Sequence, residues 1–440
     1  MIKMPHFTIQ FVCIIAVLAA ITLQSFTHSV EMKPLYGFDK EEQAPVELNF
    51  RNYYNGSYQN YLTEHAKRNT GFREFFIRSY NQFAYSSFGK ISNNNIVEGS
   101  DHELFLKMYL DEVTGKRLEK EYGDIEKANS IAKKNVEDTQ RLVDTLRKNG
   151  KIFLFVFAPT KTAVYPEKMP KDYQRQINNF SLEEYYIELF KERGIPHIDF
   201  YNYFKSIKDT ISYPLYTRYA SHWAESTIPF VGDSILRMME TLGNYKLPSI
   251  QCVDPNITTN YSDFDHELES AMNLLLPCRK PALPHPTLSL ADTLDKDHPR
   301  LLVIGDSYFD QLMFSPFKKA FQCWDFWQYY LTAYSNDYWR VPINKLKNTR
   351  STLKNADIIM VTATAPMIYN YMYGFLNSVY DLLHESDMQW EAQIEKTMNA
   401  IKNNPQWYDA IIKQAQERGC TVEENLRNNA IYVLEQNKKQ

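Results

Sequence analysis

The chain contains short, uninterrupted apolar runs, and these runs limit it to folds in which a sheet is covered on both faces. Residues 152–157 read IFLFVF and lie between Gly150 and Pro159. A run of this length bounded by turn residues is typical of a strand buried within a parallel sheet, because helices cover both faces of such a sheet. Residues 301–304 (LLVI) and 357–361 (DIIMV) repeat the pattern. We therefore expect these runs to form central strands.

Helical patterns separate the apolar runs. Residues 127–148 and 182–191 carry apolar residues at helical spacing, and a further short strand leads from the second of these segments to Asp199. Alternating helices and strands predict the α/β class, with a parallel sheet and flanking helices.

The N-terminal segment is apolar enough to cross a membrane. Residues 7–26 carry no charge and match the roughly 20 residues that a helix needs to span a bilayer. Lys3 precedes them, which favours a cytoplasmic N-terminus and an exported remainder. A cleaved signal peptide has the same layout, but no small-x-small cleavage pattern is evident in residues 24–30, so a retained anchor is the preferred interpretation.

The sequence divides into five parts. These are a cytoplasmic N-terminus (1–6), a membrane anchor or signal (7–27), a stalk with helical segments (28–90), the α/β domain (91–385) and a C-terminal helical extension (386–440). Ser386 and Thr421 begin capping-box patterns, and Asn404 stands where an N-cap would precede Pro405. Gly419 would end the middle helix, so we expect three short helices there.

Charge and composition exclude some classes of partner. The 440 residues include 49 Lys and Arg against 53 Asp and Glu, for a net charge of −4. A nucleic-acid binder is expected to carry a basic excess, so nucleic acid is not an expected partner. Aromatic residues make up 14% of the chain, which suits a sugar-stacking surface and an aromatic-rich core equally.

The cysteines predict one disulfide and no metal site. Cys252 and Cys278 flank a polar stretch in the part of the chain expected outside the cytoplasm, where disulfides persist, and they are the better candidate pair. No CxxC motif and no Cys/His cluster with zinc spacing occurs, so we expect no structural metal.

Two residues are candidates for chemistry. Ser307 follows the 301–304 strand in the sequence VIGDSY, at the carboxyl end of the sheet, where α/β folds bind ligands and where turn amides stabilise an oxyanion. A serine nucleophile needs a base, and His222 lies in a predicted loop just before an amphipathic helix. Each has a plainer interpretation: Gly-Asp-Ser is also a common turn, and a lone His is often structural.

Five sequence blocks together resemble the SGNH-hydrolase-like proteins of the alginate O-acetylation type. In chain order they are IVEGSDHELFL (96–106), FVFAPTKTAVYPEKMP (155–170), LYTRYASHW (215–223), DFDHELESAMNLL (263–275) and LLVIGDSY (301–308). The resemblance extends over roughly residues 96–381. It implies a flavodoxin-like parallel sheet and transfer of acetyl groups to exported polysaccharides.

The resemblance assigns roles to the candidate residues. Ser307 would be the nucleophile, with its amide in the oxyanion hole, and His222 the general base; such a transfer needs no metal and no cofactor. Trp223, Trp327 and Tyr308 are candidate sugar contacts near that site. The expected protein is an anchored, periplasmic acetyltransferase or esterase acting on a polysaccharide, with a membrane-bound O-acyltransferase as its partner.

The chain also departs from the family pattern. The family has an Asp two residues before the catalytic His, and Ala220 stands there. No acid or Asn occurs near Ala365, after the last strand, and the sequence does not select a replacement among Glu225, Asp306 and Asp310. Lys161 and Tyr165 are interpreted as structural in preference to substrate contacts.

The departures keep other functions open. A catalytically impaired protein that binds polysaccharide through an aromatic crevice is the alternative hypothesis. A structural subunit of an export complex, docked through the C-terminal helices, is a weaker one.

Overall fold

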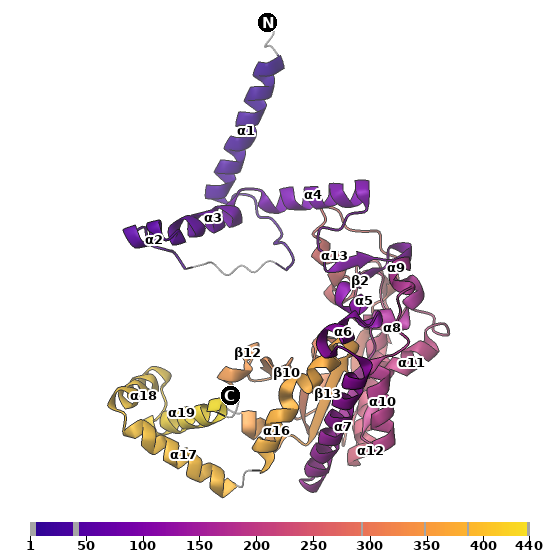
Figure 1. Ribbon diagram of the computed structural model, residues 1–440, viewed down its shortest axis with the longest axis vertical. Helices are drawn as coiled ribbons and strands as arrows, with labels where there is room; N and C mark the ends of the chain where they lie inside the picture. The colour runs from indigo at the N-terminus through magenta and orange to yellow at the C-terminus, as the bar shows by residue number, and fades with distance from the viewer. Residues whose placement is uncertain (1–5, 38–43, 292–293, 347–348, 385–386, 438–440) are drawn as a thin grey trace. The chain divides into compact units, whose positions relative to one another are not determined.

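The computed structural model describes residues 6–37, 44–291, 294–346, 349–384 and 387–437, and these form two compact units. One unit comprises residues 1–97 with 266–280, and the other comprises 98–265 with 281–440. The segment 266–280, which the sequence pattern placed in the α/β domain, therefore lies in the N-terminal unit. Each unit is described by itself (Figure 1).

The first unit is helical. Its elements are α1 (His6–Thr27), α2 (Phe50–Tyr54), α3 (Ser57–Asn69), α4 (Arg73–Phe88), α13 (Glu267–Met272) and most of the short strand β1 (Ile96–Glu98). Asn81 on α4 donates from Nδ2 to the carbonyls of Met272 and Asn273, which ties α13 to α4. The stretch Phe7–Thr27 has a mean hydropathy of 2.2, so α1 is long and apolar enough to cross a membrane.

The second unit is built on a seven-stranded sheet with the order β12-β11-β10-β9-β13-β3-β4. Its strands are β3 (Ile152–Ala158), β4 (His197–Asp199), β9 (Arg300–Gly305), β10 (Cys323–Gln328), β11 (Thr332–Ser335), β12 (Val341–Pro342) and β13 (Ile358–Thr364). The five strands from β10 to β4 run parallel, whereas β11 and β12 pair antiparallel at one edge. The α/β fold is confirmed, but the sheet is mixed because a tight turn after β10 sends the chain back.

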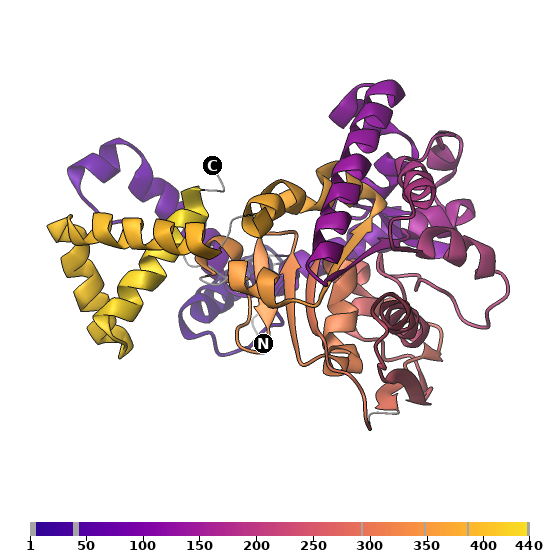
Figure 2. The same cartoon turned by 90° about the horizontal axis from the view of Figure 1, so that it is seen from below.

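Both faces of the sheet are covered, as the apolar runs require. Alternate residues of each strand enter two different cores: Phe155 and Val361 pack with α7 (Ile125–Lys148) and α10 (Leu182–Arg193), whereas Leu154 and Met360 pack with α12 (Ile228–Gly243). Figure 2 shows helices on either side of the strands. The parallel strands bring the carboxyl ends of β9, β13 and β3 to one edge, where the candidate site lies.

Smaller elements complete the second unit. They are β2 (Leu104–Leu106), α5 (Lys107–Val113), α6 (Lys116–Tyr122), α8 (Lys161–Val164), α9 (Lys171–Gln174), α11 (Phe200–Ile207), α14 (Asp310–Phe314), α15 (Thr349–Asn355) and α16 (Phe375–His384), with two small sheets, β5 (Ser249–Asp254) with β8 (Thr287–Ala291) and β6 (Ile257–Thr258) with β7 (Leu283–Pro284).

The C-terminal extension forms three helices, as predicted: α17 (Asp387–Lys402), α18 (Pro405–Arg418) and α19 (Val422–Asn437). They share a small core of their own that includes Ile401, Ile411 and Leu426. The Asn404 side chain caps α18, and Thr421 forms a capping box with Glu424. Ser386, the other predicted cap, lies outside the described residues.

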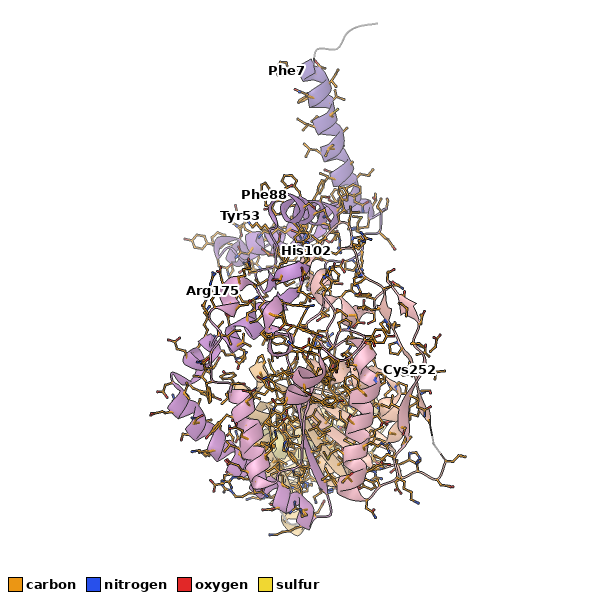
Figure 3. The ribbon with its side chains drawn as sticks, turned by 90° about the vertical axis from the view of Figure 1, so that its right-hand side faces the viewer. Phe7, Tyr53, Phe88, His102, Arg175 and Cys252 are labelled. Carbon is orange, nitrogen blue, oxygen red and sulfur yellow. The ribbon has the colours of Figure 1, made fainter. Side chains whose placement is uncertain are left out.

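The two cysteines of the predicted disulfide belong to different units. In the part of the chain that the structure describes, Cys252 and Cys278 do not bond to each other. Cys252 lies exposed on β5 in the second unit (Figure 3), whereas Cys278 belongs to the first unit. A polar stretch between two cysteines gives no information on the unit to which each belongs.

A buried ammonium group holds together the segments that carry the site. Lys161 is 1% exposed, and five oxygens lie between 2.8 and 3.3 Å from its Nζ atom. They belong to the Glu103 carboxylate and to the backbone carbonyls of Leu104, Thr217, Arg218 and Ala220. The last three carbonyls lie in the loop that leads to His222, so Lys161 fixes that loop against β2. The structural interpretation of Lys161 accounts for all of these contacts.

The Glu103 carboxylate is the counter-charge. It contacts Lys161 and Lys168 at 2.8 Å each. Burial alone would raise the pKa of Glu103, but the two ammonium groups outweigh it and hold the pKa below its usual range. The Glu103 carboxylate is therefore ionised at neutral pH, and because it and Lys161 are both buried, the pair is costly to break from one side.

We predict that Lys161→Met lowers the free energy of unfolding by about 3–5 kcal/mol, because it leaves four backbone carbonyls buried without their cation and the Glu103 carboxylate paired with Lys168 alone. Denaturant titration of the full chain in detergent, followed by tryptophan fluorescence, measures the change. Lys107→Met is the matched control, since the Lys107–Asp111 pair is exposed and contributes little. Equal losses in the two variants would contradict the role given to Lys161.

Candidate active site

Ser307 follows the carboxyl end of β9 and is the first residue of the short 3-10 helix η5 (Ser307–Phe309). Asp306, which is 2% exposed, makes this turn: its side chain accepts from the Tyr308 amide at 3.1 Å and from the amide and hydroxyl of Thr364 at 2.9 Å each. The carboxylate thus joins the end of β9 to the end of β13. Gly305 is required beside it, because a Cβ there would overlap the Thr362 methyl.

His222 meets the serine. Its Nε2 atom lies 2.9 Å from Ser307 Oγ, within hydrogen-bonding distance. Hydrogen bonds fix the loop that carries His222. The Tyr308 hydroxyl donates to the Ser221 carbonyl at 2.7 Å, and the Lys161 ammonium donates to the Ala220 carbonyl. The structure therefore brings together the two residues that the sequence singled out, with the geometry that a base needs toward a nucleophile.

Tyr329 completes the surroundings of Ser307, and sequence reasoning missed it. It follows β10 with a positive φ of 51°, and its amide donates to the Gly305 carbonyl at 2.7 Å. Its hydroxyl lies 3.2 Å from Ser307 Oγ and 3.4 Å from the Ser307 amide. Burial raises the pKa of this phenol, with the Asp306 charge adding to the effect, so Tyr329 keeps its proton. The available signal was its place directly after a strand at the same sheet edge.

Two carboxyl groups act electrostatically on His222. Burial raises the pKa of Asp310 to about 7, although the positive charge of His222 and the hydrogen bond from Gln328 oppose the shift. Burial also raises the pKa of Asp306, against hydrogen bonds from Thr364 and Tyr308 and the charge of His222. Of the three acids that the sequence left open, these two lie in the electrostatic surroundings of the imidazole.

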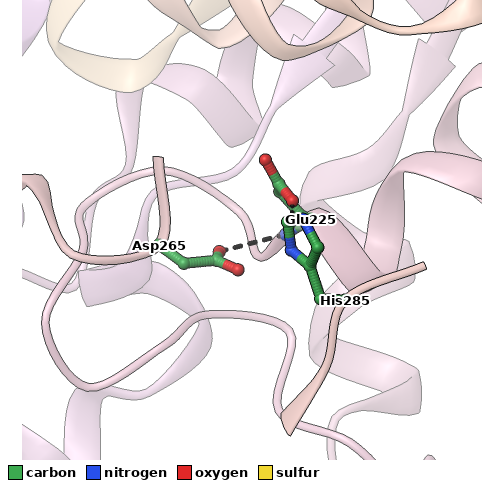
Figure 4. A group of neighbouring side chains, drawn as sticks. All are labelled: Glu225, Asp265 and His285. Carbon is green, nitrogen blue, oxygen red and sulfur yellow. Dashed lines mark hydrogen bonds and ion pairs between the residues drawn. The ribbon is translucent and has the colours of Figure 1, made fainter. Parts of the chain in front are cut away.

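The third acid has other partners. The Glu225 carboxylate pairs with His285 Nδ1 at 2.6 Å, and its amide donates to the Asp265 carboxylate at 3.1 Å (Figure 4). One ligand atom from each of these three side chains lies within 4.8 Å of the others, so among the described residues they form a group able to hold a metal ion. The residues come from separate segments, which is why no metal-site spacing was visible in the sequence.

Ala220, where the resemblance led us to expect an Asp, is fully buried and its carbonyl accepts from Lys161. Ala365 follows β13 and is also buried, at 6% exposure. Tyr165 supports the same loop, since its hydroxyl accepts from the Leu215 amide at 3.1 Å. These positions contribute packing and backbone contacts.

The three residues predicted to contact sugar are buried and cannot do so. Trp223, Trp327 and Tyr308 are at most 1% exposed, so none presents a ring face to a sugar. Trp327 lies on β10, in an aromatic segment that is a core strand, and Trp223 packs against Phe200 and Phe204. Aromatic content near a motif did not distinguish a surface from the core.

Comparison with known proteins gives one family match. Residues 115–249 match the family model described as "SGNH hydrolase-like domain, acetyltransferase AlgX". The matched segment includes Lys161 and His222 and ends before Ser307. No curated protein matches the chain.

Solved structures give more distant similarities. The O-acetyltransferase domain of Pseudomonas putida AlgJ is 16% identical with a TM-score of 0.40, over 68% of this chain and 98% of that one. Pseudomonas aeruginosa AlgX is 13% identical with a TM-score of 0.40, over 64% of this chain and 66% of that one. Bacillus cereus PatB1 is 10% identical with a TM-score of 0.36, over 56% and 92%.

The family match confirms the resemblance that the motifs predicted, over a narrower range of residues. Residues 115–249 are similar to the SGNH hydrolase-like domain of the AlgX acetyltransferase type.

Proposed function

We propose that the chain is a serine-dependent O-acetyltransferase that works through an acetyl-serine intermediate. The observation that carries the proposal is the 2.9 Å approach of His222 Nε2 to Ser307 Oγ. The Tyr329 hydroxyl donates to Ser307 Oγ and accepts from the Ser307 amide, so an O–H and an N–H suited to an oxyanion lie beside the serine. The AlgX-type family match supports acetyl transfer as the reaction.

The first half of the reaction acetylates the serine. Ser307 Oγ attacks the carbonyl carbon of the donor ester while its proton passes to His222 Nε2. The negative charge on the carbonyl oxygen is stabilised by the Ser307 N–H and the Tyr329 O–H. The bond to the leaving oxygen then breaks, and His222 returns the proton to that oxygen.

The second half transfers the acetyl group. A sugar hydroxyl attacks the acetyl carbon and gives its proton to His222 Nε2. The bond to Ser307 breaks, and Oγ takes the proton back. Water in place of the sugar would give hydrolysis, so transferase and esterase differ only in which hydroxyl reaches the acetyl-serine.

The proposed setting is the outer side of a membrane. Helix α1 would anchor the chain, and the second unit would lie in the periplasm, where an exported polysaccharide passes. Acetyl groups would then arrive from a membrane-bound O-acyltransferase partner. The apolar length of α1 and the family match support this setting.

Ala220 favours a second candidate function. Without an Asp at this position, a catalytically impaired protein that binds polysaccharide would keep the same fold. The Ser307–His222 contact and the retained donors favour the enzyme, and the experiment below separates the two.

We predict that the full chain in detergent hydrolyses a chromogenic acetyl ester, and that Ser307→Ala and His222→Ala each lower kcat/KM roughly 10³-fold, because each removes a group that acts in the transition state. A fluorophosphonate should label the parent chain and not Ser307→Ala. Ser206→Ala and His102→Ala, at exposed positions, serve as controls and should keep the parent rate. Absence of both turnover and labelling would favour the binding function.

We predict a pH-dependent effect of Asp310→Asn. Above its pKa of about 7 the Asp310 carboxylate is charged and favours the His222 imidazolium; well below it the carboxyl is neutral and gives no such help. The variant should therefore lose about tenfold in kcat/KM at pH 8.5 and much less at pH 5.5, as measured by a pH–rate profile. The same loss at every pH would assign Asp310 a purely structural role through Gln328.

We predict that the mature chain fractionates with membranes and retains its N-terminal peptide, because α1 is long enough to span a bilayer. Detergent should release it, and high salt should not. A soluble mature chain that begins near residue 28 would identify α1 as a cleaved signal peptide.

A further inference from the structure

A small pocket is lined in part by residues that closely follow Ser307 and His222 in the sequence, and none of its lining residues takes part in the proposed chemistry. Its volume is about 210 Å³. This is below the roughly 300–1,000 Å³ of sites for drug-sized ligands, so it suits a unit the size of one sugar ring. The lining residues are Glu225, Ile228, Phe264, Pro286, Leu288, Gln311, Phe314, Ser315 and Pro316. We call it the Gln311 pocket.

Residues on two sides of the Gln311 pocket belong to the segments that carry the catalytic pair. Gln311 and Phe314 follow Ser307 by four and seven residues, on the helix α14 that continues directly from η5. Glu225 follows His222 by three residues and begins the turn η3 (Glu225–Thr227). A group held in the pocket therefore contacts the helical segment that begins at Ser307 and the turn that follows His222.

The side-chain amide of Gln311 is the main indication that the pocket binds a ligand. It is 4% exposed, yet neither its Oε1 nor its Nε2 atom has a hydrogen-bond partner in the chain. A buried amide without partners costs free energy, so such groups mark places where another molecule supplies the bonds. An amide offers one acceptor and two donor hydrogens, which matches a hydroxyl group, since a hydroxyl both donates and accepts.

Glu225 adds a fixed acceptor. His285 pairs with its carboxylate, and Asp265 accepts from its backbone amide, so the side chain lies held at the wall of the pocket (Figure 4). A carboxylate accepts hydrogen bonds from hydroxyl groups and repels other carboxylates. Among the described residues that line the pocket, none is Lys or Arg, so nothing there neutralises an acidic ligand.

Aromatic rings extend from the pocket mouth. Phe314 packs against Phe264 at 5.8 Å and against Trp339 at 5.7 Å between ring centroids. Phe314 is 57% exposed and Trp339 is 53% exposed, so this strip presents open ring faces, unlike the buried aromatic residues that the sequence suggested. Open ring faces beside hydroxyl-binding groups are suited to the apolar faces of sugar rings.

We propose that the Gln311 pocket is the acceptor subsite, and that it takes a sugar unit bearing free hydroxyls and no carboxylate. Gln311 and Glu225 bind hydroxyl groups of that unit, and Phe314 with Trp339 contacts the next unit of the chain. The inference rests on the proposed acetyl transfer and narrows its substrate class: neutral polysaccharides are accepted, and polyuronates are disfavoured by Glu225.

The test measures acetyl transfer by the full chain in detergent, from a chromogenic acetyl ester to matched oligosaccharide pairs. Each pair differs only at C6: oligomannoside and oligomannuronate, oligoglucoside and oligoglucuronate, oligogalactoside and oligogalacturonate. We expect a neutral member to be acetylated with kcat/KM at least tenfold above its uronate. Gln311→Met, which keeps the shape and removes the amide, should raise the KM for that acceptor roughly tenfold.

Further variants keep the test decisive. Phe314→Ala and Trp339→Ala change exposed side chains, so they remain informative even if Gln311→Met does not fold, and each should raise the KM for longer oligosaccharides more than for short ones. Trp407→Ala, on α18, is the control with an exposed aromatic outside the strip.

The failures are distinguishable. If the parent chain shows no Ser307-dependent ester turnover, the proposed function itself fails. If turnover is present but uronates are preferred, no sugar is acetylated, or the acceptor KM is unchanged in Gln311→Met and Phe314→Ala, the subsite is refuted. Calorimetric binding of Ca²⁺ or Zn²⁺ that Glu225→Gln and His285→Ala abolish would make the group a cation site and likewise overturn the proposal.

Discussion

The buried Lys161–Glu103 pair is the interaction on which the rest of the site depends. An ammonium group in a dry interior is tolerated only where charge and hydrogen-bond acceptors surround it, and here the acceptors are supplied by β2 and by the loop before His222. The loop has no regular secondary structure of its own between Thr217 and His222. The conformation of the loop is therefore determined by the hydrogen bonds that its carbonyls accept from the Lys161 ammonium.

Ser307 is likewise positioned by a buried ionisable group, the Asp306 carboxylate at the edge of the sheet. Asp306 bonds to Thr364 and to the turn amide that follows Ser307, so β9 and β13 must end together for the serine to emerge at the edge. Two buried ionisable groups, Lys161 and Asp306, thus position His222 and Ser307 respectively. Each of them contacts the backbone of the segment that it positions, whereas the reacting atoms are those of His222 and Ser307. This explains how His222 Nε2 lies 2.9 Å from Ser307 Oγ although position 220 is Ala.

Much of this was predictable from the sequence, for physical reasons. Apolar runs such as 152–157 fit only covered strands, and VIGDSY placed Ser307 at the carboxyl edge because a Gly-Asp turn after a buried strand leaves few alternatives. Trp327 shows the limit: an aromatic strand and an aromatic surface have the same composition, and only pairing with β9 reveals which one it is. Tyr329 carried one signal, its place directly after a strand at the same sheet edge. The surroundings of Gln311 and Trp339 depend on how distant segments meet, and a single sequence carries no signal for that. Cys252 and Cys278 belong to different units, which their spacing in the sequence does not reveal.

The central claim is that Ser307 is acetylated with the help of His222. Mixing the full chain with an acetyl donor, quenching in acid within the first turnover and mapping peptides by mass spectrometry tests it directly. The account predicts an acetyl group on the Ser307 peptide, formed rapidly in the parent chain, formed far more slowly in His222→Ala, and lost on addition of a neutral oligosaccharide. Turnover of the donor with no acetyl group on Ser307, or with the acetyl group on another residue, would contradict it.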